Sequence, residues 1–278
     1  MSCTLEELHQ AHYEMLCTFA DYCEQHSIVY SLHWGTLLGA VRHNNIIPWD
    51  DDVDVAMSIE NFKKLCDCVK KDPIDGIFLQ WIDTDNQYPK YFAKLRKNGT
   101  YMAESYLENL DIHQGIWIDI FIYVNKPDSK FGVLYQELLL RYFIFLCHSL
   151  LYSGKLTFIK KESSLIKFLK ENLSTFIIFV FKKLFNDDFI NKKRNKIFNK
   201  ISKTGKKNSK YVREIDLGVQ SDIKRLRSLY EPTVFHEFGN TKLRIPENYD
   251  QMLKSCYGDD YMTPIVTHSH VDLENIQL

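Results

Sequence analysis

The sequence contains no long hydrophobic run and carries almost no net charge. No uninterrupted apolar stretch is longer than six residues, the length of Phe176–Phe181, whereas a helix needs about 20 apolar residues to cross a bilayer. The formal net charge of −1 over 278 residues points to no charged partner and gives no indication of nucleic-acid binding. With 45% hydrophobic and 26% charged residues, the composition is that of a globular protein of one or two domains.

The sequence also lacks paired cysteines, internal repeats and low-complexity linkers. Its seven cysteines are scattered and none stands in a C-x-x-C pair, which indicates reduced, buried thiols rather than disulfides or a zinc site. The N-terminal residues are polar and have a helical pattern, without the apolar core of a signal peptide. These features predict a cytoplasmic protein.

The neutral total conceals one basic segment. Residues 155–210 contain 16 Lys and Arg against four Asp and Glu, and no acid occurs from 190 to 210. Such a segment favours an anionic partner or surface, although a solvated lysine-rich stretch has the same composition. The aromatic run Phe176–Phe181 is flanked by lysines, which fits a helix lying on a membrane surface or one packed into the core. Peripheral membrane association through 155–210 is therefore one expectation.

Hydrophobic periodicity changes near residue 127. Before it, the capping-box pair Thr4 and Glu7 predicts a helix that runs to about Gln25. Helices are also predicted at 35–43 and 58–71, and strands at 28–34, 51–57, 77–82, 91–97 and 115–124. After it, long helices are predicted over 129–204, and a mixed tail from 211 with a helix near 249–256.

This pattern predicts an α+β fold, with a mixed sheet flanked by helices. We expect a core at 1–127, a helical and basic subdomain at 128–210, and a C-terminal segment at 211–278 that packs back on the core.

Four aspartates stand at the entry to one predicted strand: Asp50, Asp51, Asp52 and Asp54. Because alternate residues of a strand share a face, Asp52 and Asp54 are expected to point the same way while the valines next to them enter the core. Asp50 and Asp51 are then lead-in residues, supporting or solvated. Two carboxylates about 4 Å apart repel each other by roughly 4 kcal/mol at an effective dielectric near 20, so a pair fixed on a strand favours a proton or a cation.

A divalent cation with oxygen ligands suits this pair, and Mg²⁺ (or Mn²⁺) suits a site that substrate phosphates complete. A calcium loop of the EF-hand type is excluded, because Val55 and Asn61 stand where its glycine and glutamate belong. Asp119 is the only charged residue from 115 to 124, and a lone buried acid is costly without a partner. It either caps a turn, pairs with an arginine, or shares a cation with Asp52 and Asp54, which is the interpretation we favour.

A turn at Gly35 and Thr36 precedes the aspartates, between a predicted strand and a predicted helix. Backbone N–H groups at such a helix start bind phosphate. A glycine turn, an aspartate pair on the next strand and a third acidic strand are the parts of a metal-dependent site of the nucleotidyltransferase type.

These motifs resemble the LicD family. The resemblance lies in "GTLLGAVRH", "IIPWDDDVDVAM", "AKLRKNGT", "GIWIDIFIY" and the late "YGDDYMTP" with a following histidine, and it spans about 22–268 with little from 130 to 205. The family comprises phosphocholine transferases related to fukutin and fukutin-related protein, with a nucleotidyltransferase-like fold. The sequence departs from the family at Trp34, where a glycine is usual, and at Ile122, where a proline is usual.

The resemblance implies metal-dependent transfer of phosphocholine from CDP-choline to a hydroxyl of a cell-surface glycan or its lipid-linked precursor, with release of CMP. Asp52, Asp54 and Asp119 would hold the metal on the donor diphosphate, and Asp119 is the candidate base. It also implies a bacterial protein in the cytoplasm, at the inner face of the membrane.

Further substrate contacts are expected from basic and aromatic residues near these motifs. We expect phosphate oxygens to be bound by Gly35, Thr36, Arg42, Lys94 and Arg96. For each of the three basic residues, the alternative is an ordinary surface position without contact to the substrate. Choline is a quaternary ammonium that favours aromatic faces, and the nearby rings are Trp34, Trp49, Tyr91 and Trp117. In the tail, Lys242 and His268 are candidates.

Three alternatives remain open on the sequence. The donor could be the CDP form of phosphoethanolamine, glycerol phosphate or ribitol phosphate, because the motifs address only a diphosphate and a metal. A nucleotidyltransferase would instead attack the α-phosphorus and release pyrophosphate. A non-catalytic glycan- or membrane-binding protein would not need the aspartates at all.

Overall fold

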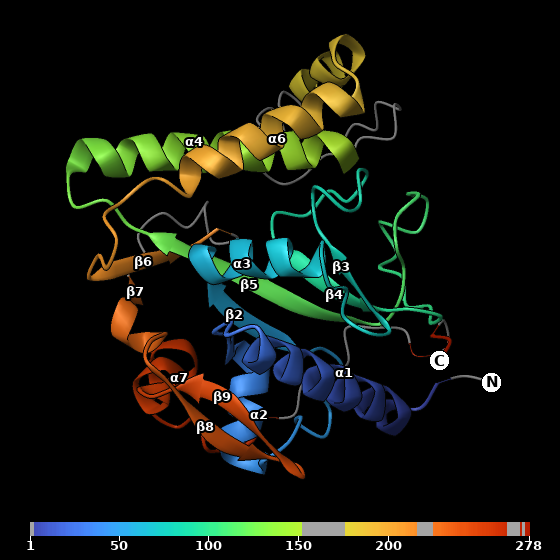
Figure 1. Ribbon diagram of the computed structural model, residues 1–278, viewed down its shortest axis with the longest axis vertical. Coiled ribbons are helices and arrows are strands. Elements are labelled where there is room, and N and C mark those ends of the chain that lie inside the picture. Colours follow the sequence, from blue (N-terminus) through green and yellow to red (C-terminus); the bar gives the residue numbers. More distant parts are fainter. Residues whose placement is uncertain (1–2, 152–175, 216–224, 266–272, 274–275) are drawn as a thin grey trace, which may run out of the picture.

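The computed structural model describes residues 3–151, 176–215, 225–265, 273 and 276–278. Within them, one seven-stranded sheet forms the centre of the molecule (Figure 1). Its main order is β1-β2-β5-β4-β3, and β6 and β7 continue from β5. The strands are β1 (Ser31–Leu32), β2 (Asp54–Ser58), β3 (Ile77–Gln80), β4 (Ala93–Lys97), β5 (Trp117–Asn125), β6 (Tyr211–Glu214) and β7 (Arg225–Leu226).

The pair β2 and β5 is parallel, whereas every other strand pair of this sheet is antiparallel. The mixed sheet and its covering helices confirm the predicted α+β class.

Two helices begin where the sequence predicted. Helix α1 (Leu5–Gln25) starts with the Thr4 capping box, in which the Thr4 hydroxyl accepts from the Glu7 N–H at 3.2 Å. Helix α3 (Ile59–Val69) starts at Ser58, whose hydroxyl accepts from the Asn61 N–H at 3.3 Å. These side chains replace the hydrogen-bond partners that a first helical turn lacks. Both helices pack against β5, in front of the sheet in Figure 1.

The segment after β5 is helical, as predicted. Helix α4 (Lys130–Leu151) packs against α6 (Asp187–Ile201), and the two lie above the sheet in Figure 1. Residues 152–175 of the predicted helical segment lie outside the described residues. Among the helices that are described, none is long and apolar enough to cross a membrane.

The tail returns to the core, but as strands where loops were expected. Strand β6 pairs with the end of β5, with Glu214 opposite Tyr123. The hairpin of β8 (Thr233–Phe238) and β9 (Thr241–Pro246) contacts β1, and α7 (Tyr249–Tyr257) packs on α2 (Trp34–His43). Strand β6 was missed because it is short and its partner β5 lies far away in the sequence. The β8–β9 hairpin is local, and the turn signal at Gly239 and Asn240 was overlooked.

All seven cysteines are free thiols, as predicted, but only Cys3, Cys23 and Cys147 are buried. The other four are partly exposed.

Candidate active site

The strand register brings two acidic residues together. Asp54 on β2 is the direct partner of Asp119 on β5, and neighbours on paired strands share a face. Val53 and Ile118 are fully buried, so the apolar side of each strand faces the core as predicted. The ladder extends one residue before β2, because the Asp119 N–H donates to the Val53 carbonyl at 2.8 Å.

Thr36 holds the start of β2. Its hydroxyl accepts the Asp54 N–H at 2.8 Å, and its side chain is 3% exposed. The phosphate contact predicted for the backbone N–H of Thr36 remains a prediction, and its hydroxyl faces the strand. Thr36 therefore positions Asp54.

A cavity of about 710 Å³ opens beside these aspartates. It brings together six of the predicted site residues, namely Trp34, Gly35, Arg42, Trp49, Asp52 and Asp54. The rest of its wall comes from Leu38, Ile47, Asp50, Tyr257, Asp260, Tyr261, Thr263 and Ile265. The last five of these belong to the C-terminal segment, so the site is assembled from the two ends of the chain.

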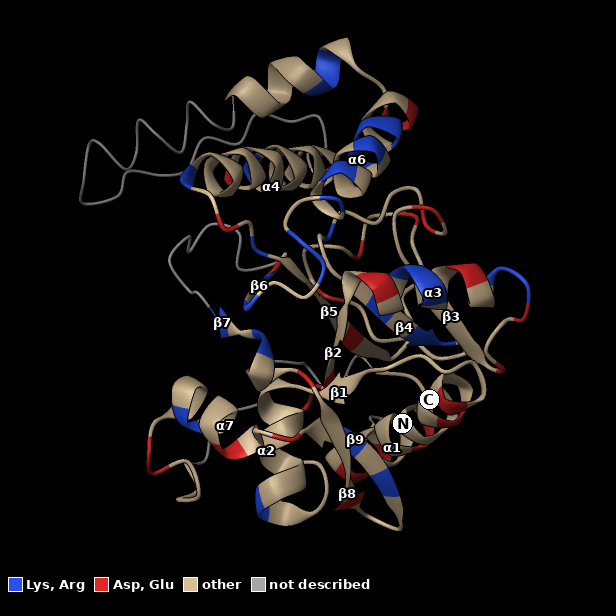
Figure 2. Cartoon of the chain, turned by 60° about the vertical axis from the view of Figure 1, so that its left-hand side comes forward, with Lys and Arg blue, Asp and Glu red and all other residues tan. Residues whose placement is uncertain are grey.

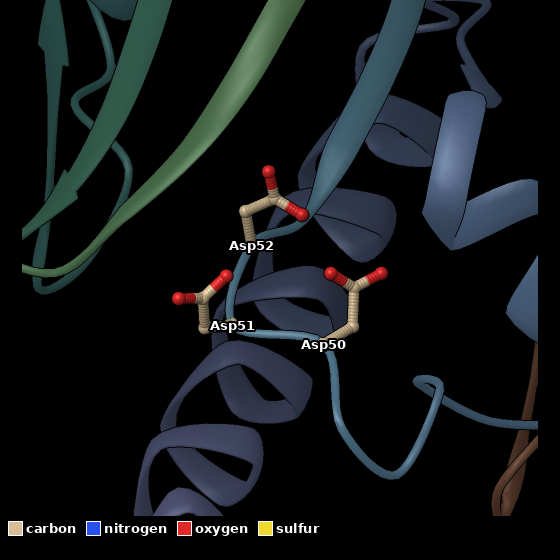
Figure 3. A group of neighbouring side chains, drawn as sticks. All are labelled: Asp50, Asp51 and Asp52. Atoms are coloured by element: carbon tan, nitrogen blue, oxygen red, sulfur yellow. The ribbon is translucent and has the colours of Figure 1, made fainter. Parts of the chain in front are cut away.

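Asp50 and Asp51 are not solvated lead-in residues. Asp50 lines the cavity, and Asp51 is only 1% exposed. The structure starts β2 at Asp54, so Asp50–Asp52 form a loop rather than part of the strand. The loop gathers consecutive side chains, and each of the three carboxylates offers an oxygen within 4.8 Å of the others (Figure 3).

Burial and mutual repulsion perturb these carboxylates. Burial, reinforced by the charge of Asp50, raises the pKa of Asp52 to about 7. Burial, followed by the charges of Asp52 and Asp119, raises the pKa of Asp54 well above its usual value. Groups that repel in this way bind either protons or a cation. Their donor set consists of carboxylate oxygens, the ligands that Mg²⁺ and Mn²⁺ prefer, so these residues fit such an ion.

Gly35 lets helix α2 approach the carboxylate loop. A Cβ atom at this position would lie 2.7 Å from Oδ2 of Asp50, closer than any real contact. The N-terminus of α2 therefore faces the loop with its positive dipole end, an arrangement that favours anions. The predicted contact of this turn with phosphate remains a prediction.

Trp34 keeps a backbone conformation that suits glycine. Its φ is +41°, a region that bulky residues rarely adopt. The Arg225 guanidinium lies 4.8 Å from the centre of the Trp34 ring, and Glu214 lies 3.6 Å from Arg225. His33 packs on the ring as well, at 5.0 Å between centroids. These contacts hold the indole ring in place at the position where the resemblance led us to expect glycine.

Lys94 and Asp119 form a buried ion pair. Nζ of Lys94 lies 2.8 Å from Oδ1 of Asp119 and 3.5 Å from Oε2 of Glu104, and the lysine side chain is 1% exposed. Burial lowers the pKa of Lys94, against the opposing effect of the two acids. Neither Lys94 nor Asp119 is part of the cavity wall. Lys94 is thus a charge partner of Asp119, and the predicted phosphate contact does not fit its place.

Arg96 and Trp117 also lie inside the protein. Arg96 is fully buried and donates to Oε1 of Gln80 at 2.8 Å and to the Gly115 carbonyl at 2.7 Å. The Trp117 ring is 5% exposed. Because both are sealed within the sheet and its connections, the predicted contacts with phosphate and choline do not fit them.

The remaining candidates differ in position. Arg42 lines the cavity and donates to the Tyr261 carbonyl at 3.1 Å. Lys242 lies on the β8–β9 hairpin, where its exposed ammonium pairs with Glu237 at 3.0 Å, and it is not part of the cavity wall. Tyr91 is partly buried against the core and is also absent from the wall. His268 lies outside the described residues.

The sequence reasoning missed Tyr257, Asp260 and Tyr261 as site residues. The signal was present, since the acidic and aromatic run "YGDDYMTP" was part of the resemblance. The residues of that run do not by themselves reveal that they line the cavity, because this depends on the packing of α7 against α2 in the folded chain.

This geometry defines a class of protein: an α+β domain whose carboxylate-lined cavity lies beside its parallel strand pair. Residues 27–131 match the family described as LicD/FKTN/FKRP, nucleotidyltransferase domain. This segment, 105 of the 278 residues, matches the family that the motifs resemble.

Individual relatives match over a similar segment. The lipopolysaccharide cholinephosphotransferase LicD of Haemophilus influenzae is 32% identical over 127 residues, which are 45% of this chain and 46% of that protein. A protein of Rickettsia typhi, named only as uncharacterized, is 41% identical over 125 residues, 45% of this chain and 32% of its own. The matched segment thus spans less than half the length of these curated relatives.

Proposed function

We propose that this protein transfers phosphocholine from CDP-choline to a hydroxyl of a cell-surface glycan or its lipid-linked precursor and releases CMP. The observation that carries the proposal is the cavity in which Asp50, Asp52 and Asp54 meet the N-terminus of α2. It is supported by the relative from Haemophilus influenzae, whose name describes transfer of phosphocholine to lipopolysaccharide.

Asp52 is central to the proposed metal site. It belongs to the predicted set with Asp54 and Asp119, and also to the cluster of carboxylates in the loop. These residues would hold Mg²⁺ or Mn²⁺, which supplies charge neutralisation for a diphosphate when it is bound. Lys94 lies 2.8 Å from Asp119 and holds its carboxylate in place by an ion pair. Asp119 remains the candidate for taking the proton of the acceptor hydroxyl.

Arg42 and the start of α2 would bind the donor phosphates. The Arg42 guanidinium is held in the cavity wall by the Tyr261 carbonyl, and a fixed guanidinium is a strong partner for phosphate oxygens. Backbone N–H groups at the start of α2, where Gly35 lines the cavity, would bind phosphate as well. Thr36 contributes indirectly by fixing the backbone of Asp54.

The proposal is tested by offering the purified protein a panel of CDP-linked alcohols with a glycan acceptor. We expect CMP release with CDP-choline and Mg²⁺, and a loss of at least about 100-fold in Asp52→Asn or after chelation of the metal. Release of pyrophosphate from CTP would favour the nucleotidyltransferase alternative. Full activity without a divalent cation would contradict the proposed mechanism.

We also propose that the helical subdomain contacts an anionic membrane, where a lipid-linked acceptor would reside. One side of α4 exposes large apolar residues at helical spacing: Phe131, Leu134, Tyr135, Leu138 and Tyr142. Lysine and arginine residues follow the neighbouring α6 (Figure 2). Apolar side chains beside basic ones are typical of protein surfaces that rest on anionic lipids.

A further inference from the structure

The three tryptophans predicted to contact choline each lie beside a cation of the protein itself. Guanidinium or ammonium groups stand 4.8 Å from the ring centre of Trp34, 5.9 Å from that of Trp49, and 4.0 and 4.9 Å from that of Trp117. A ring attracts a cation through the negative charge of its face. A second cation at the same ring would be repelled by the first, so these rings are poor sites for a quaternary ammonium.

Tyr257 is an aromatic residue of the same cavity that has no such partner. It stands at the end of α7, and 42% of its surface is exposed. In the part of the chain that the structure describes, no cation and no second ring is stacked on it. Asp260 lines the cavity three residues further on, and Asp50, Asp52 and Asp54 line it as well. A ring with an open face and several carboxylates nearby is the combination that attracts a positively charged ligand.

We propose that Tyr257 and Asp260 form the site for the quaternary ammonium of the donor. This inference rests on the proposed function, and it names the part of the cavity that selects choline. The nitrogen of phosphocholine lies only two carbon atoms from its ester oxygen, so its site must adjoin the groups that bind phosphate. Tyr257 meets this condition, because it shares one cavity wall with the carboxylates and with Arg42.

The same reasoning assigns the other end of the donor. Trp34 lines the cavity with Arg225 on its ring and therefore suits an uncharged planar group, which the cytosine base provides. Choline at Tyr257 and cytosine at Trp34 leave the diphosphate between them, next to Asp52 and the start of α2.

The test compares two donors that differ only in charge: CDP-choline and CDP-3,3-dimethylbutanol, in which carbon replaces the charged nitrogen. CMP release gives KM for both donors. We expect Tyr257→Leu and Asp260→Asn to raise KM about tenfold for CDP-choline and to leave the neutral analogue within about twofold. Tyr257→Phe keeps the ring and should retain wild-type selectivity. Trp34→Leu should raise KM for both donors alike.

Equal effects of Tyr257→Leu on the two donors, or none on either, would overturn the inference while leaving the transferase proposal standing. Circular dichroism confirms that each variant is folded. If the wild-type protein releases no CMP from either donor, the transferase proposal fails, and calorimetry with phosphocholine and 3,3-dimethylbutyl phosphate tests the site by itself. Binding that prefers phosphocholine and loses this preference in Tyr257→Leu supports the site, and binding without preference, or no binding, refutes it.

Discussion

Asp54 and Asp119 are direct partners on the parallel strands β2 and β5, although 65 positions separate them in the sequence. Lys94 reaches Asp119 from the other neighbouring strand, β4, where the two are again direct partners. Three adjacent strands therefore each contribute one ionisable side chain to the same side of the sheet. This arrangement fixes the positions of the charges before any substrate binds, which is the condition for effective electrostatic catalysis.

Replacing Asp54 should separate activity from stability. In Asp54→Asn we expect CMP release to fall at least about 100-fold, because a neutral amide is a weak ligand for Mg²⁺. The protein should melt no lower than the wild type, since the change removes a carboxyl group whose ionisation is opposed by burial and by Asp52 and Asp119. Thermal unfolding and the CMP assay measure the two effects. If the activity of Asp54→Asn falls only as much as the fraction of folded protein, Asp54 has no direct role in catalysis.

The hydroxyl of Thr36 should matter for the geometry of the site. Thr36→Val leaves the buried Asp54 N–H without its acceptor, which costs about 1–3 kcal/mol in the free energy of unfolding. The rate of CMP release should fall while KM for the donor changes little. Thr36→Ser keeps the acceptor and serves as the control. Urea unfolding and steady-state kinetics of both variants check the prediction, and equal behaviour of valine and serine would refute it.

Removing the charge of Lys94 should destabilise the fold. Lys94→Met leaves Asp119 without its buried cation, whereas Glu104 keeps Lys90 at 2.9 Å. Breaking a buried ion pair costs about 3–5 kcal/mol. The double variant Lys94→Met, Asp119→Asn should recover part of this loss, because the unpaired charge disappears with it. Urea unfolding of the two variants and of Asp119→Asn completes a double-mutant cycle. Additive effects would show that the pair does not interact.

The stability of the protein should fall in mild acid through His12. Burial lowers the pKa of His12 from 6.5 to about 4, and its Nε2 lies 3.0 Å from the Trp117 carbonyl. Below pH 6.5 the unfolded chain takes up a proton that the folded protein excludes, so stability is lost as the pH falls toward 4. At pH 5 this linkage amounts to about 2 kcal/mol. In urea unfolding, His12→Gln should lose less stability than the wild type between pH 7 and pH 5. If both proteins lose the same free energy of unfolding over this range, His12 is not the cause.

The apolar side of α4 should govern binding to lipid. In flotation assays we expect the wild-type protein to bind vesicles containing phosphatidylglycerol and not vesicles of phosphatidylcholine alone. Replacing Phe131, Leu134 and Leu138 together by serine should abolish this binding and leave CMP release to a soluble acceptor intact. Size-exclusion chromatography with light scattering provides the control. A wild-type dimer that the triple variant converts to a monomer would show that a second copy, rather than a membrane, covers this surface.

Much of the fold and part of the site follow from local sequence. Capping residues and hydrophobic periodicity predicted α1, α2, α3 and β5 close to their observed bounds, because these elements depend on interactions between residues near in sequence. The run of aspartates identified the loop before β2 as acidic, and the surrounding motifs resemble the LicD family, whose model matches residues 27–131.

Only the tertiary structure decided which charged residues face the cavity and which face one another. Lys94 and Arg96 stand near the site motifs in the sequence, yet the strand pairing points both side chains into the interior of the protein. There Lys94 forms an ion pair with Asp119, and Arg96 donates a hydrogen bond to Gln80. Asp50 joins the cavity because β2 begins later than its alternating pattern suggested. Tyr257 arrives from the far end of the chain on α7, through packing against α2. Residue type and spacing determine what each segment can do, whereas the long-range packing of strands and helices determines which of those groups share one space.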